Sequence, residues 1–96
     1  MKLWFDDIQV APEGYVECNS LACAISRILD HRDSNREDLI LMDIGESGES
    51  LLMWLSAMGY RYPIRIHTGV SDAVLLRMRE IIRDNGWTEV PGGVEL

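Results

Sequence analysis

The stretch from Asp38 to Gly48 constrains the fold of this chain more than any other. It contains the apolar residues 39–42 and Ile44, separated by a single acid, Asp43, with charged residues before it and two glycines after it. The apolar run is too short for a helix of its own, so it predicts a strand buried on both faces. In open α/β sheets, ligands bind where such strands end. Asp43 is therefore a candidate site residue.

Length and composition indicate a single small domain spanning residues 1–96. The hydrophobic content of 47% is enough for one core and leaves little for a second. Sixteen acids against nine bases give a net charge of -7, and Lys2 is the only lysine. This balance argues against an extended face that binds nucleic acid by neutralising phosphates alone. Small anions remain compatible with it where a bound metal ion reverses the local charge.

The cysteines and the first residues of the chain predict a reduced, cytoplasmic setting. Cys18 and Cys23 do not have the spacing of a zinc site, and we expect both to fill the core. The residues after Lys2 lack the apolar segment of a signal peptide. No apolar run approaches the roughly 20 residues that span a bilayer, so no membrane partner is expected.

The apolar patterns predict strands that alternate with helices along most of the chain. Alternating or buried apolar runs predict strands at 2–6, 15–18, 39–44 and 64–66, with a less regular fifth run at 87–90. Helical periodicity predicts helices at 20–31, at 49–58 and from Ser71 to Asn85. The segment 9–14 contains a proline and a glycine and is expected to be a loop.

This order of elements predicts an α/β fold with a mainly parallel sheet of four to five strands. About three helices are expected on its two faces, joined by right-handed crossovers. Parallel strands bring their carboxyl ends to one edge of the sheet. The residues expected to meet there are Asp6, Asp7, Asp43, His67 and Thr68.

The three acids at this edge predict a magnesium site. Asp6, Asp7 and Asp43 cannot all stay ionised close together unless a cation joins them. Oxygen ligands with room for water suit Mg²⁺. The ion would then draw a phosphate group into a site that is otherwise acidic.

Four further residues could complete a phosphate site at the same edge. The hydroxyl of Thr68 could donate to a phosphate oxygen, and the backbone N–H groups of Gly45 and Gly69 are free of side chains that would block an approach. His67 could transfer a proton near neutral pH.

Each of these candidates also has a structural interpretation. Asp6 and Asp7 could be solvated acids at the start of a turn. Asp43 could cap the turn that follows its strand, and His67 could be a hydrogen-bonded structural histidine.

Taken together, these residues resemble the CheY-like receiver domains of response regulators. The resemblance implies a compact, flavodoxin-like sheet in the strand order 2-1-3-4-5. It also implies that Asp6 and Asp7 bind magnesium, that Asp43 accepts a phosphoryl group and that Thr68 contacts the phosphoryl oxygens. The lysine that receivers carry after the fifth strand is absent here. The loop 7–15 is also too short for the first helix of a receiver.

The shortened form is similar to a narrower group, the cyclic-phosphate processing receiver domains. The matching segments are 4–7, 11–15, 43–45 and 67–68, whereas residues 41–42 and Val70 replace the Asp-His and the asparagine of that group. This resemblance implies binding or hydrolysis of 2′,3′-cyclic phosphates on nucleotides or RNA ends. Asp43, His67 and Thr68 would carry the reaction.

A second function remains open at this stage. The chain could be a degenerate receiver that binds a protein partner, either constitutively or when Asp43 is phosphorylated.

Overall fold

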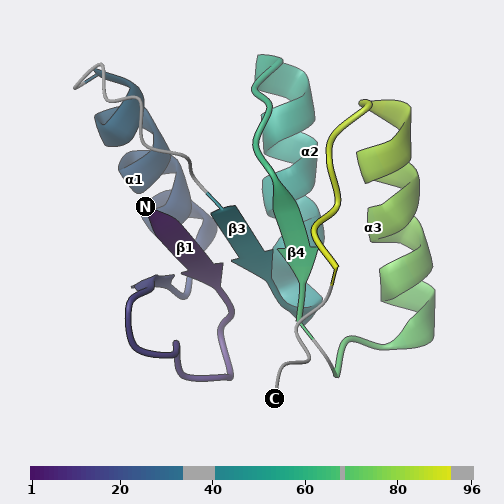
Figure 1. Ribbon diagram of the computed structural model, residues 1–96, viewed down its shortest axis with the longest axis horizontal. Helices are drawn as coiled ribbons and strands as arrows, with labels where there is room; N and C mark the ends of the chain where they lie inside the picture. The colour runs from purple at the N-terminus through teal and green to yellow at the C-terminus, as the bar shows by residue number, and fades with distance from the viewer. Residues whose placement is uncertain (34–40, 68, 92–96) are drawn as a thin grey trace.

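Within the described residues, four parallel strands form one sheet (Figure 1). The computed structural model describes residues 1–33, 41–67 and 69–91, and the sheet order is β2-β1-β3-β4. The predicted α/β class and flavodoxin-like strand order are confirmed for these strands. The elements are β1 (Lys2–Phe5), β2 (Val16–Cys18), α1 (Leu21–Asp33), β3 (Leu41–Ile44), a 3-10 turn η1 (Glu46–Gly48), α2 (Glu49–Met58), β4 (Ile64–Ile66) and α3 (Asp72–Asp84).

Most predicted boundaries agree with these elements within two residues. The bounds of α2 and β4 match the prediction at both ends. Gly59 ends α2 because it adopts a left-handed conformation, with φ of 73°, that glycine enters without steric cost. Residues 39 and 40 of the predicted third strand lie outside the described residues.

The core lies between one face of the sheet and the helices. Strand pairing aligns Leu3 with Met42 and Met42 with Ile64. Two residues further along the strands, Phe5, Ile44 and Ile66 form a second aligned row on the same face. All six side chains are buried. They share one hydrophobic cluster with residues from each of the three helices, which include Ile28 of α1, Leu55 of α2 and Met78 of α3.

The described helices therefore all cover the same face of the sheet, and the expectation of helices on two faces is wrong. Figure 1 shows the strands in front of α1 and α2. The handedness of the crossovers gives the reason. From β2 to β3 and from β3 to β4 the chain moves across the sheet in one direction, so right-handed crossovers place these helices on one face. Only the step from β1 to β2 runs the other way, and its connection contains no helix.

The predicted fifth strand at 87–90 is reduced to a single bridge. Glu89 pairs in parallel with Ile64, whose N–H donates to the carbonyl of Thr88 at 3.0 Å. The carbonyl of Ile64 in turn accepts from the N–H of Val90 at 2.7 Å. Because β4 has only three residues, it offers this segment little length for pairing.

The two cysteines lie where the composition suggested. Cys18 is buried in the core and Cys23 is partly buried against it, and neither is in a disulfide. Burial, with a further contribution from the neighbouring Cys23 thiol, raises the pKa of the Cys18 thiol to about 12. Separately, none of the helices in the described ranges has the length and apolar character needed to cross a membrane.

Because the core depends on one sheet face, truncating a helix residue that packs on it should be costly. Leu55 of α2 is fully buried, so Leu55→Ala is expected to lower the free energy of unfolding by about 2–5 kcal/mol. Met53 of the same helix is 60% exposed, and Met53→Ala should change stability by less than about 0.5 kcal/mol. Urea denaturation of both variants measures the difference, and equal losses would contradict this description of the core.

Candidate functional site

The sheet face that the helices leave uncovered carries a row of aromatic and charged side chains. Strand pairing sets Trp4 beside Asp43, and Asp43 beside Arg65. Paired residues of neighbouring strands project to the same face of a sheet. We call this side the open face. Its row alternates with the apolar rows that pack against the helices.

His67, directly after β4, places its ring between two buried carboxylates. Its Nδ1 lies 2.5 Å from Oδ1 of Asp43 and its Nε2 lies 3.2 Å from Oδ2 of Asp6. The exposed fractions of Asp6, Asp43 and His67 are 4%, 3% and 6%. The first contact is a hydrogen bond, whereas Nε2 is not aligned for a hydrogen bond to Asp6. A single imidazole therefore joins acids from two separate strand ends.

Trp4 fixes the plane of this imidazole. The two rings are stacked, with centroids 3.7 Å apart and an interplanar angle of 17°. The indole Nε1 donates to the backbone carbonyl of Gln9 at 3.0 Å, which anchors it to the loop after β1. Because Trp4 is itself 92% buried, the stack has little freedom to tilt.

Asp6 closes the loop after β1 and faces His67 at the same time. Its Oδ1 accepts the backbone N–H groups of Ile8 at 2.8 Å and Gln9 at 3.1 Å, an arrangement typical of aspartate in a tight turn. Its Oδ2 faces His67. The conformation of the loop and the position of the imidazole are thus linked through one carboxylate.

The second oxygen of Asp43 contacts Tyr15 and Arg65. The Tyr15 hydroxyl donates to Oδ2 of Asp43 at 3.2 Å, and Nη1 of Arg65 lies 3.4 Å from that oxygen. Nη1 also donates to the Tyr15 hydroxyl at 3.2 Å. Burial and then the charge of Asp43 raise the pKa of Tyr15, so the hydroxyl keeps its proton and remains a donor.

Gly45 lets these groups approach one another. A Cβ at this position would overlap the carboxylate of Asp6 and touch the ring of His67. The N–H of Gly45 donates to the carbonyl of Phe5 at 2.9 Å, so in this structure it is not free to bind phosphate as predicted. The role that the structure gives Gly45 is steric.

The other predicted site residues are arranged differently. Asp7 is exposed, and the one hydrogen bond that its carboxylate accepts from the described residues is long, 3.5 Å, from the Ser47 hydroxyl. Gly69 has φ of 94°, a conformation that favours glycine. Thr68 lies outside the described residues. The structure thus brings together Asp6, Asp43 and His67 and leaves Asp7 apart.

The residues as arranged do not fit a magnesium ion. In the described part of the chain, no group of three or more His, Cys, Asp and Glu side chains is placed to hold a metal. The imidazole of His67 lies between Asp6 and Asp43, where a shared cation would have to be. Each oxygen of these two carboxylates already faces a protein nitrogen or hydroxyl. Magnesium binding stays a prediction.

Sequence reasoning missed three residues of this group, Trp4, Tyr15 and Arg65. A signal for Arg65 was available, because it lies between two core isoleucines and must point away from the core. Combined with the strand order, that alternation places it beside Asp43. For Tyr15 there is no comparable signal, since it reaches the site from a loop.

Comparison of the chain with models of protein families, with curated proteins and with solved structures found no match. Fold and site together define an α/β protein with a flavodoxin-like strand order and a buried acid-histidine group at the carboxyl ends of its strands. Membership of the receiver superfamily stays a prediction.

The tight space at Gly45 gives a test of the site geometry. Gly45→Ala should displace Asp6 and His67 and lower the free energy of unfolding by about 1–3 kcal/mol. Gly14→Ala is the matched control. A Cβ at this position has no atom within 4 Å, so the variant bears only the conformational cost of a side chain at φ of 92°. The ring protons of His67, followed by NMR, should shift only in Gly45→Ala. Unchanged ring resonances in that variant would contradict the contacts described.

The position of His67 predicts that it competes with a divalent cation. His67→Ala leaves Asp6 and Asp43 without the group between them, and two close carboxylates attract a cation. Calorimetric titration should therefore show Mg²⁺ binding at least about tenfold tighter in His67→Ala than in the wild type. The double variant with Asp43→Asn should lose this gain. Equal or weaker binding in His67→Ala would show that the acids do not form a latent metal site.

Proposed function

We propose that this site binds phosphate esters and hydrolyses 2′,3′-cyclic phosphates of nucleotides or RNA ends, with His67 as the residue that transfers the proton. The observation that carries the proposal is the imidazole held between two buried carboxylates at the carboxyl ends of parallel strands. Ligands of open α/β sheets bind at this edge. Buried titratable groups gathered there favour a site over a purely structural cluster.

The hydrogen bond to Asp43 orients His67 for this chemistry. In the proposed mechanism Asp43 accepts the hydrogen bond from Nδ1, which leaves Nε2 as the atom that takes up a proton. In the proposed reaction a water oxygen forms a bond to phosphorus, and its proton passes to Nε2, which is buried in this structure and has to be uncovered when the substrate binds. The bond from phosphorus to the 2′ or 3′ oxygen breaks, and that oxygen receives the proton from Nε2.

The neighbours of His67 would complete the site. Thr68 is proposed to donate its hydroxyl to a phosphate oxygen, and the N–H of Gly69 to approach the same group. Magnesium, if it binds together with the substrate, would neutralise phosphate charge. The proton transfer described here depends on His67 and Asp43 alone.

The environment of Asp43 favours this proposal over a phosphorylated receiver. A phosphoryl acceptor needs a free carboxylate oxygen, whereas both oxygens of Asp43 contact other side chains. The alternative, a degenerate receiver that binds a protein partner, is therefore kept as an outcome of the experiment below.

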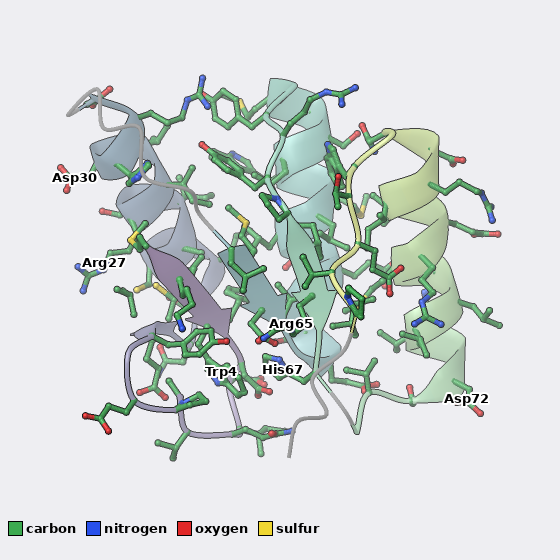
Figure 2. All side chains as sticks on the ribbon, in the orientation of Figure 1. Trp4, Arg27, Asp30, Arg65, His67 and Asp72 are labelled. Atoms are coloured by element: carbon green, nitrogen blue, oxygen red, sulfur yellow. The ribbon has the colours of Figure 1, made fainter. Side chains whose placement is uncertain are left out.

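Turnover of nucleoside 2′,3′-cyclic phosphates tests the proposal. The wild type should form a single phosphomonoester from 2′,3′-cyclic AMP, and Asp43→Asn and His67→Gln should each lower kcat about a hundredfold or more. Asp30→Asn, an exposed acid of α1 far from the site, is the matched control and should retain activity (Figure 2). Product formation is measured by ³¹P NMR.

Three results separate the alternatives. Turnover that is lost with a chelator and restored by Mg²⁺ would support the magnesium prediction. No turnover by the wild type, or equal turnover in all variants, would overturn the proposal. Labelling of Asp43 by acetyl phosphate without turnover would favour the signalling receiver.

A further inference from the structure

We propose that Arg65 and Tyr15 form the phosphate-binding subsite, so that the ligand reaches Asp43 and His67 from the open face of the sheet. The inference rests on the proposed function and adds to it the residues that recognise the anion and the direction of approach. The ligand class is a phosphate ester, either a mononucleotide or the terminal phosphate of an RNA.

The side chain of Arg65 is more exposed than the acid and the histidine that it lies beside. Its side chain is 26% exposed, compared with 5% for Asp43 and 3% for His67. Figure 2 shows Arg65, His67 and Trp4 close together near the carboxyl ends of the strands, with Arg27 and Asp72 at opposite margins of the molecule. A ligand that approaches the open face therefore meets Arg65 before it meets the acids.

The contacts that Arg65 makes do not lock it in place. A structural arginine-carboxylate pair typically uses two parallel N–H bonds of about 2.7–2.9 Å. Arg65 contacts Asp43 and Tyr15 through Nη1 alone, at 3.4 and 3.2 Å. Its Nε is buried and has no hydrogen-bond partner among the described residues. Rotation of the guanidinium onto a phosphate would give the fork of donors two acceptor oxygens and satisfy more of its N–H groups.

Tyr15 supplies a neutral donor beside this cation. Its raised pKa keeps the hydroxyl protonated, and the hydroxyl already contacts both Asp43 and Arg65. When Arg65 turns toward an anion, the same hydroxyl can remain on Asp43 or donate to a phosphate oxygen. In either case it stays between the ligand and the carboxylate.

Two cations lie on this face beside Tyr15, where they could attract an anion. The ammonium group of Lys2, the only lysine of the chain, lies 4.8 Å from the centroid of the Tyr15 ring. Two cations, Lys2 and Arg65, therefore flank Tyr15 in a protein whose net charge is -7. These two cations offset the charges of Asp43 and of Glu17, which strand pairing sets beside Trp4 on the same face.

Binding of a reaction product, which needs no catalysis, tests the inference. Adenosine 3′-monophosphate added to the ¹⁵N-labelled wild type should shift resonances of Lys2, Trp4, Tyr15 and Arg65, whereas adenosine should not. Arg65→Gln should weaken binding about tenfold or more, because one charged hydrogen-bond donor is lost. Arg27→Gln, an exposed arginine of α1, is the matched control and should bind as the wild type does. A short RNA with a 3′-phosphate distinguishes an RNA end from a mononucleotide by its affinity.

The outcomes distinguish this inference from the proposed function. Turnover in the wild type with an unchanged KM in Arg65→Gln would overturn the subsite and leave the function standing. Product binding that depends on Arg65 without turnover would support the subsite and overturn the proposed catalysis. Shifts confined to the helices, or equal binding by Arg65→Gln and Arg27→Gln, would also overturn the subsite. Circular dichroism of each variant shows that a loss of binding is not a loss of folding.

Discussion

The handedness of the connections between parallel strands determines where this protein can have a site. Right-handed crossovers put α1, α2 and α3 on one face, and the one step in the opposite direction is made by a loop. The apolar rows of the strands therefore all pack on one side. The intervening residues, among them Trp4, Asp43 and Arg65, face a side with no described helix. A parallel sheet ordinarily has apolar residues on both faces because helices cover both. Here one row is polar because no described helix covers that face.

Charged groups buried in that row need hydrogen-bond partners, and this requirement shapes the surrounding structure. A buried carboxylate without partners costs several kcal/mol, so Asp6 and Asp43 each need donors on both oxygens. The turn after β1 supplies two N–H groups to Asp6, and Tyr15 from the same loop supplies a hydroxyl to Asp43. The ring of His67 is hydrogen-bonded to Asp43 and lies beside Asp6 without an aligned hydrogen bond to it. The loop, β3 and the end of β4 are consequently held together by one polar network, and this explains how a connection without a helix keeps a defined shape.

The sequence predicts the local elements better than it predicts how they combine. Periodicity and the left-handed Gly59 define α2, and the alternation around Arg65 defines β4, because these signals act within a few residues. The short loop 7–15 predicts that no helix lies between the first two strands, and the structure agrees. That the described helices then all lie on one face follows only when the strand order is taken into account. The predicted fifth strand is only a single bridge for a related reason, because the length of β4 limits its pairing. At the site, the positions of Asp6, Asp43 and His67 follow from the strand order. The role of Tyr15 and the exposure of Asp7 depend on the path of a loop and could not be predicted.

The magnesium site implied by the receiver resemblance and the histidine arrangement in the structure solve the same electrostatic problem in different ways. Two acids at the ends of neighbouring strands repel each other, and a group that holds positive charge or donates hydrogen bonds must stand between them. A metal ion leaves the carboxylates as ligands and keeps coordination positions for a phosphate. An imidazole occupies that position itself, so any anion must bind beside it through other donors. In this protein the donors within reach are on the open face, at Arg65 and Tyr15. In the proposed site, the central position of His67 therefore assigns anion recognition to Arg65, a residue that the receiver pattern does not include.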